Sequence, residues 1–227
     1  MSVRRAEFLA GLRDEFPLLV GVFPFGMIYG LLALQAGLSP AAAQGMSSIV
    51  FAGSAQFITA QLVHEAAPSL VIILTIGIVN LRHMLYSASL APHLRELPTK
   101  WKVLLSYLLT DEAYAVVVTR YEGGGTRGAA QWYFLGAGLA LWTTWQISTA
   151  AGILLGASVP ADWPLDFALP VTFIAIVVPA LRDRPALAAS LSAGIVALLV
   201  FGLPFKLGLI AAALVGIAVG TLLEKRP

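Results

Sequence analysis

Residues 68–92, PSLVIILTIGIVNLRHMLYSASLAP, form a long apolar run between two prolines, with an arginine near its middle. About 20 predominantly apolar residues are enough for a helix to cross the hydrocarbon core of a bilayer. A charged side chain at the centre of such a helix costs at least about 2.5 kcal/mol, unless it has a partner or lines an aqueous cavity. The run therefore predicts a membrane-spanning helix in which Arg82 meets a specific partner.

The composition of the whole chain favours the same class of protein. Of its 227 residues, 59% are hydrophobic and only 11% are charged, whereas charged residues make up about 25% of ordinary soluble domains. We therefore expect an all-α, polytopic helical membrane protein with about eight hydrophobic segments, some of them interrupted or re-entrant. The expected segments are Phe16–Gly37, Ala41–Val63, Ser69–Ala91, Val103–Thr119, Trp132–Ala157, Phe167–Leu181, Ala186–Leu203 and Pro204–Leu223.

The segments are predicted to form a single transmembrane domain over residues 1–227. Residues 1–15 mix basic and acidic side chains without a cleavage signal, so we expect a retained cytoplasmic lead-in. The glycine-rich residues 120–130 are expected to link two halves of four segments each. Lys and Arg gather on the side of the termini whether all segments cross or two of them re-enter, so both termini are predicted to be cytoplasmic.

The charge and the cysteine count exclude several kinds of site. The net charge of +2 is small and scattered along the chain, so we expect no nucleic-acid partner. The chain has no cysteine, which excludes disulfides and thiolate metal ligands, and its three histidines lack the spacing of metal ligands. We therefore expect neither a metal nor a cofactor.

The polar residues of the 68–92 run are sorted to one face of the predicted helix. At 100° per residue, Arg82 shares a stripe with Tyr86, and Asn80 and His83 widen this polar face. A continuous apolar stripe occupies a different side of the helix. The sorting indicates that the polar face meets a partner helix or lines a path through the membrane.

Segment Val103–Thr119 offers a partner for Arg82, because Asp111 lies at its midpoint with Glu112 beside it. We expect one carboxylate to pair with Arg82 while the other holds or releases a proton, as buried membrane carboxyls commonly do. A purely structural ion pair between two helices is the alternative. His83 is either a pH-responsive group or the donor of a single structural hydrogen bond.

Segment one contains the sequence VFPFGMIYG, in which Pro24 is flanked by Phe23 and Phe25. A proline inside a helix lacks one backbone donor, so it leaves a carbonyl group free and bends the helix. Opened backbone of this kind binds ligand groups where it lines a cavity. A simple packing kink is the alternative.

Segment two is rich in amide and hydroxyl side chains and contains a Gly53-Ser54 step. A break at this step would begin a half-helix, whose N-terminal amides attract a substrate carboxylate, with Gln56 nearby. Phe51 is expected to shape an apolar pocket together with Phe23 and Phe25. Close helix packing through small residues is the alternative explanation of the composition.

Small residues recur at a spacing of four in three other places. This spacing is typical of close contacts between membrane helices. It occurs in Gly26/Gly30, in Gly152/Gly156 and in the series Gly208, Ala212, Gly216 and Gly220.

Four ordered stretches of the chain are distinctive: FPFGMIYGLLALQAGLSP at 23–40, FAGSAQF at 51–57, VNLRHMLYSASLAPHL at 79–94 and LLTDEAYA at 108–115. Together they resemble the AzlC family, the large subunit of branched-chain amino acid exporters. The resemblance implies a permease of the bacterial cytoplasmic (inner) membrane that exports branched-chain and similar amino acids. It also implies a small hydrophobic partner subunit of the AzlD type.

The residues and the resemblance together predict a secondary transporter of amino acids, coupled to protons, and not an enzyme. Arg82 or the half-helix amides at 53–56 would meet the substrate carboxylate, and Asp111 or Glu112 would meet its ammonium group or carry a proton. An intramembrane hydrolase with Ser54 as nucleophile and His83 as base is one alternative. A channel or scaffold subunit is another, and a homo-oligomer is compatible with the glycine motifs.

Overall fold

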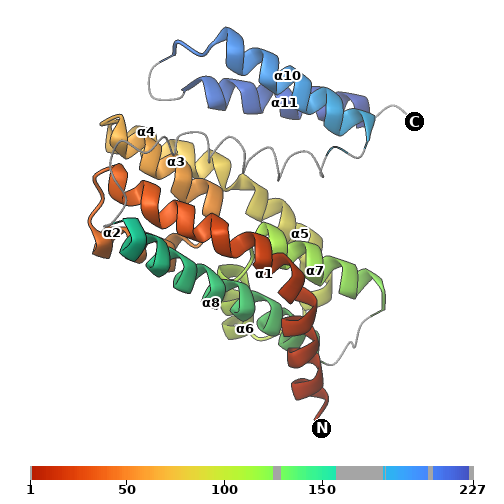
Figure 1. The fold of residues 1–227 in the computed structure, drawn as a ribbon. Helices are drawn as coiled ribbons and strands as arrows, with labels where there is room; N and C mark the ends of the chain where they lie inside the picture. Colours follow the sequence, from red (N-terminus) through yellow and green to blue (C-terminus); the bar gives the residue numbers. More distant parts are fainter. Residues whose placement is uncertain (1, 125–128, 157–180, 182, 204–206, 225–227) are drawn as a thin grey trace. The chain divides into compact units, whose positions relative to one another are not determined.

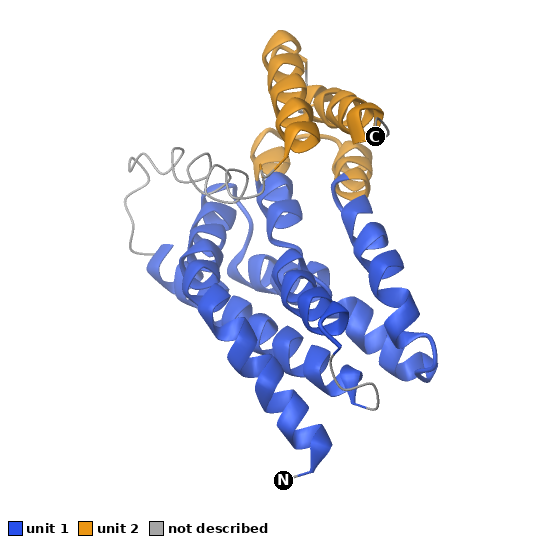
Figure 2. Cartoon of the chain, turned by 90° about the vertical axis from the view of Figure 1, so that its right-hand side faces the viewer, with its two compact units in different colours: residues 1–60, 79–161 blue, residues 61–78, 162–227 orange. Residues whose placement is uncertain are grey.

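The computed structural model describes residues 2–124, 129–156, 181, 183–203 and 207–224, and every regular element in these ranges is an α-helix (Figure 1). The all-α prediction is therefore confirmed. The described residues fall into two compact units, residues 1–60 with 79–161 and residues 61–78 with 162–227 (Figure 2). The described helices are α1 (Val3–Gln35), α2 (Pro40–Val50), α3 (Gly53–His64), α4 (Ser69–Val79), α5 (Leu81–Leu94), α6 (Thr99–Tyr107), α7 (Asp111–Glu122), α8 (Ala130–Gly156), α10 (Arg184–Leu199) and α11 (Leu207–Glu224).

Three described helices are long and apolar enough to cross a membrane. They are Val3–Gln35, Ser69–Leu94, which comprises α4 and α5, and Leu207–Glu224. These helices confirm a helical membrane protein, while the number of crossings stays a prediction. Segment Phe167–Leu181, apart from its last residue, lies outside the described residues.

Helix α1 differs from the predicted first segment at its N-terminal end. It begins at Val3 and continues for 33 residues, so residues 3–15 are helical and continuous with the first apolar segment, while their cytoplasmic location stays a prediction. Pro17 and Pro24 both lie inside α1 without ending it. At 1.5 Å per residue, the helix is about 50 Å long, which exceeds the hydrocarbon thickness of a bilayer.

Helices α1 and α8 pack so closely that glycine is required where they touch. A Cβ atom added at Gly30 would lie 2.4 Å from the carbonyl oxygen of Thr149. A Cβ atom added at Gly152 would lie 2.0 Å from the carbonyl oxygen of Met27. These distances leave no room for any side chain, so the predicted role of the glycine motifs in helix contact is confirmed here.

Polar side chains join α2 to α8. Gln44 Nε2 and Ser48 Oγ both donate to Gln146 Oε1, at 2.8 and 2.9 Å. Gln146 Nε2 in turn donates to the backbone oxygen of Ser47 at 3.1 Å. Part of the polar composition of segment two therefore serves to join helices by hydrogen bonds.

Segment two is interrupted, as its Gly-Ser step predicts. Helix α2 ends at Val50, and Phe51 adopts a left-handed backbone conformation with φ 40° and ψ 50°. Helix α3 then begins at Gly53. The predicted break and the half-helix that starts at this glycine are both confirmed.

Two further segments that the sequence presents as continuous are also broken. A turn at Asn80 separates α4 from α5, two residues before Arg82. Residues 108–110 separate α6 from α7. Asp111 and Glu112 therefore occupy the first turn of a half-helix, and the expectation that Asp111 lies in the middle of one continuous helix is wrong. Thr110 explains the break, because its hydroxyl accepts a hydrogen bond from the Ala113 amide and caps α7.

In the second unit, α10 and α11 pack through the last of the small-residue series. A Cβ atom added at Gly216 would lie 3.0 Å from the carbonyl oxygen of Ala189 and 3.0 Å from Cβ of Ala193. A Cβ atom added at Gly208 would lie 2.9 Å from the carbonyl oxygen of Val200. The series is therefore a helix contact within the chain.

The contact between α1 and α8 predicts a large difference between two glycine substitutions. Gly152→Ala should lower the melting temperature of the detergent-solubilised protein, because its new methyl group overlaps the Met27 carbonyl. Gly21→Ala is the matched control, since nothing lies within 4 Å of a Cβ atom added there. Alanine favours helix over glycine by up to about 1 kcal/mol, so the control should keep or raise the melting temperature. Equal melting temperatures for the two variants would contradict the close packing.

Candidate functional site: a charged cluster at three helix breaks

Arg82 lies at the centre of a compact polar cluster in the first unit. Its Nη1 pairs with Asp111 Oδ2, and its Nη2 donates to Ser54 Oγ at 2.6 Å. The hydroxyl of Tyr86 donates to the second carboxylate oxygen of Asp111 at 2.8 Å. Both oxygens of Asp111 and both terminal nitrogens of Arg82 are therefore engaged. Of the two carboxylates that the sequence offers to Arg82, Asp111 is the one that pairs with it.

The helix breaks bring these side chains together. Ser54 is the second residue of α3, Arg82 the second of α5 and Asp111 the first of α7. The cluster thus joins the N-terminal turns of three half-helices. Helix N-termini carry unpaired backbone amides and a partial positive charge, so they favour an anion. With a guanidinium group added, the site suits a carboxylate, and Asp111 supplies one from within the chain.

The ion pair is only partly removed from solvent in the isolated chain. The Arg82 side chain is 29% exposed and that of Asp111 is 36% exposed. Nε of Arg82 is buried and has no hydrogen-bond acceptor among the described residues. The guanidinium group therefore keeps donor capacity beyond the bonds that it makes to Asp111 and Ser54.

Two tyrosines extend the cluster along α5 and α7. The rings of Tyr86 and Tyr114 stack with centroids 4.4 Å apart, and the Tyr114 hydroxyl donates to Ser89 Oγ at 3.0 Å. The sequence analysis does not assign Tyr114 to the site, although it follows Asp111 by three residues and shares its helix face. His83 contacts the edge of Tyr86, with ring centroids 6.0 Å apart.

An aromatic core packs against the start of α3, at the break in segment two. Phe25 stacks on Phe57 at 4.5 Å and meets Trp145 edge-on at 5.7 Å. A Cβ atom at Gly53 would lie 3.1 Å from Trp145 and 3.2 Å from Phe25, so the start of α3 presses directly on these rings. Trp145 Nε1 donates to Gln56 Oε1 at 3.0 Å. The sequence analysis did not identify Trp145, because α8 shows no local signal that sets it apart.

The remaining residues predicted to bind substrate lie in different places: some are buried and others are exposed. Phe51 is buried, with its ring centroid 6.0 Å from that of Tyr107. Phe23 and Pro24 are exposed, whereas the neighbouring Phe25 is buried, so the structure does not bring the first two to the cluster. Asn80 lies at the turn before α5, and its Oδ1 is buried without a hydrogen-bond donor among the described residues.

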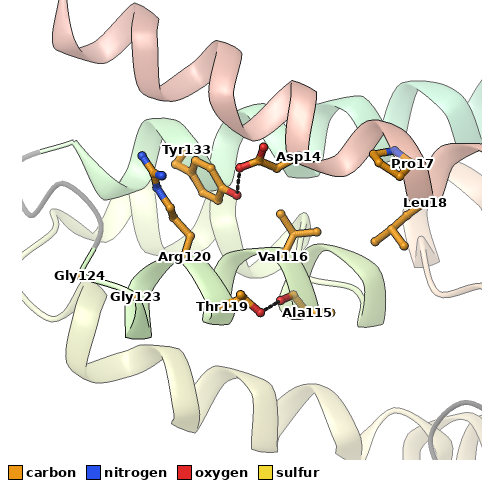
Figure 3. A pocket seen from close by; sticks show the side chains of 10 residues that line it. All are labelled: Asp14, Pro17, Leu18, Ala115, Val116, Thr119, Arg120, Gly123, Gly124 and Tyr133. Carbon is orange, nitrogen blue, oxygen red and sulfur yellow. Dashed lines mark hydrogen bonds between the residues drawn. The ribbon is translucent and has the colours of Figure 1, made fainter.

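A separate cavity of about 900 Å³ opens between α1, α7 and α8 (Figure 3). On its wall the Tyr133 hydroxyl donates to Asp14 Oδ2 at 2.8 Å, and the guanidinium of Arg120 lies 5.3 Å from the centre of the Tyr133 ring. Arg120 also bonds Glu7 at 3.1 Å. The lining contains none of the residues that the sequence analysis assigned to substrate. This cavity is therefore a second polar region of the same unit.

The described residues give no support for metal binding. They contain no group of three or more His, Cys, Asp or Glu side chains that is placed to hold a metal ion. The Arg82 cluster instead combines one cation, one carboxylate and three hydroxyl-bearing side chains. Such a set of groups binds small polar or zwitterionic molecules.

The fold and the cluster define a helical membrane protein with a charged site at interrupted helices. The family model described as AzlC protein matches residues 17–159, and the chain belongs to this family. The match includes every residue of the Arg82 cluster.

Individual relatives agree with this assignment. An uncharacterized membrane protein of Archaeoglobus fulgidus is 32% identical over 218 residues, which cover 94% of each chain. The inner membrane protein YgaZ of Escherichia coli is 26% identical over 96% of this chain and 89% of its own. The branched-chain amino acid transport protein AzlC of Bacillus subtilis is 27% identical over 76% of this chain and 69% of its own. No solved structure matches the chain significantly.

The ion pair predicts a specific pattern of stabilities in a double-mutant cycle. Asp111→Asn leaves Arg82 without its counter-charge, so this single change should lower the melting temperature more than the double change Arg82→Gln with Asp111→Asn. Glu122→Gln is the control, because Glu122 is an exposed carboxylate on the same helix. Its melting temperature should match that of the unmodified protein. Additive losses in the double variant would show that the two side chains do not act as a pair.

Proposed function

We propose that the protein is a secondary transporter that exports branched-chain and similar amino acids across the bacterial inner membrane. The observation that carries the proposal is the Arg82–Asp111 pair at the N-termini of three half-helices. Interrupted membrane helices that direct their termini at one point are typical of transporter binding sites. The membership of the AzlC family and the similarity to the branched-chain amino acid transport protein AzlC of Bacillus subtilis support the substrate class.

An amino acid is a zwitterion, and the cluster offers a complement for each of its charges. The substrate carboxylate would take the place of Asp111 at Arg82, where Ser54 and the start of α3 add donors. The ammonium group would pair with the released Asp111, whose second oxygen is held by Tyr86. Exchange of one carboxylate for another keeps the arginine neutralised throughout, which avoids the cost of a bare charge in the membrane.

The apolar side chain of the substrate would lie against the aromatic core. Phe25, Phe51 and Trp145 surround the break before α3, next to the proposed carboxylate site. Aromatic and aliphatic side chains bury apolar surface without a directional requirement, so such a wall accepts leucine, isoleucine, valine or methionine. Discrimination among these substrates would be modest, since a single methylene changes binding by only about 1–3 kcal/mol.

The remaining parts of the proposal concern assembly and energy coupling. We propose that export is coupled to protons, that both termini are cytoplasmic and that a small hydrophobic subunit of the AzlD type completes the transporter. The hydrolase alternative is not favoured, because Ser54 Oγ accepts its hydrogen bond from Arg82 and none is made to His83. No observation specifically supports a channel or scaffold role.

Uptake of labelled leucine into everted membrane vesicles tests the proposal, with the chain and its small partner subunit produced together. Arg82→Ala should abolish uptake while the protein remains in the membrane at its normal level. Lys100→Ala, at an exposed position away from the cluster, is the control and should transport normally. Normal leucine uptake by Arg82→Ala would contradict the site. Loss of the protein from the membrane would assign the ion pair a structural role.

A further inference from the structure

Glu15 is the most unusual carboxyl group in the described part of the chain. It lies in the α1 helix and is completely buried, with 0% of its surface exposed. Neither of its carboxylate oxygens has a hydrogen-bond partner among the described residues. Removing an ionised carboxylate from water without hydrogen bonds is very costly, so such a group requires a proton, a cation or a ligand. The account of the Arg82 cluster gives Glu15 no role.

The packing of α1 against α7 identifies the neighbour of Glu15. The two helices run antiparallel in register, because Glu7 near the start of α1 bonds Arg120 near the end of α7. Eight residues further along α1, Glu15 comes level with the residue eight positions before Arg120, which is Glu112. The two carboxyl groups are close enough to interact electrostatically. A buried glutamate thus faces a second glutamate across the helix contact.

Neither α2 nor α8 supplies a cation to this pair, although Arg82 on α5 acts electrostatically on Glu112. Helix α8 contributes one ionisable group near Glu15, the Tyr133 hydroxyl. This hydroxyl donates its hydrogen bond to Asp14. Helix α2 contains no ionisable residue. On α7, Arg120 is bonded to Glu7, and Arg82 on α5 is bonded to Asp111. The charge that acts on Glu15 from α7 is therefore that of the acidic Glu112.

We propose that Glu15 and Glu112 form a pair of neighbouring carboxyl groups that holds one proton, and that this pair is the proton-carrying site of the transporter. One proton removes the repulsion between the buried Glu15 carboxylate and the carboxylate of Glu112. Glu112 is one of the two carboxylates that the sequence predicts to carry a proton, whereas the sequence alone does not identify Glu15. The proposal deepens the proposed transport function and rests on it.

The position of the pair links it to the substrate site. Glu112 follows Asp111 directly in the first turn of α7, and both Asp111 and Arg82 act electrostatically on Glu112. When substrate displaces Asp111 from Arg82, the negative charge beside Glu112 changes, and with it the affinity of the pair for its proton. The cavity lined by Asp14 and Tyr133 begins at the residue that precedes Glu15 in α1, and it would give the proton a route to water.

A spectroscopic measurement tests the proton of the carboxyl pair independently of transport. The infrared spectrum of the purified protein at neutral pH should contain the C=O stretch of a protonated carboxyl group, which shifts in D₂O. Glu15→Gln, which keeps the size of the side chain, should remove this band. Glu122→Gln, at an exposed position, should leave it unchanged. Absence of the band from the unmodified protein, or its persistence in both Glu15→Gln and Glu112→Gln, would overturn the proposal.

Two transport assays then test the role of the proton. In proteoliposomes, Glu15→Gln should lose the accumulation of leucine driven by a pH gradient, yet retain exchange of labelled for unlabelled leucine, because exchange requires no net proton movement. Gradient-driven accumulation at the normal level in Glu15→Gln would overturn the proposal. If the unmodified protein exchanges no leucine while Glu15→Gln removes the infrared band, the proposed function fails and the proton on the carboxyl pair stands.

Discussion

An arginine inside an apolar helix sets the constraint that the rest of this structure satisfies. Arg82 needs an anion and several acceptors at a depth where water is scarce, and a continuous helix offers neither. Breaks in the helices supply the groups that Arg82 requires. Breaks before Gly53, Leu81 and Asp111 bring three N-terminal turns to the guanidinium group, together with a carboxylate from one of them. The ion pair and the broken helices therefore depend on each other.

Broken helices require a rigid support, and the contact between α1 and α8 provides it. Glycines on both helices allow their backbones to touch, and the hydrogen bonds of Gln146 attach α2 to the same support. Trp145 extends from α8 to the start of α3, where its indole nitrogen donates to Gln56. The charged cluster is thus carried by elements whose own positions are fixed by close packing, which limits the cost of preorganising polar groups.

Sequence reasoning predicted the class of fold, the break at Gly53 and the partner of Arg82, because each has a local physical cause. The length of an apolar segment, a Gly-Ser step and an unpaired charge can all be identified from the sequence without tertiary information. The breaks at Asn80 and at residues 108–110 were missed, although Thr110 followed by two acidic residues is an ordinary helix start. Trp145 and Glu15 were also missed, since only tertiary packing distinguishes them from other residues of their helices. For the same reason, exposed Phe23 was assigned to the site with buried Phe25.

The central claim is that Arg82 exchanges the Asp111 carboxylate for that of the substrate, and ligand-induced stabilisation of the purified transporter tests it most directly. Leucine should raise the melting temperature, whereas leucinamide, which lacks the carboxylate, should not. Stabilisation by leucine should vanish in Arg82→Gln, because this variant loses the group that binds the carboxylate. Equal stabilisation by leucine and leucinamide, or undiminished stabilisation of Arg82→Gln by leucine, would contradict the account.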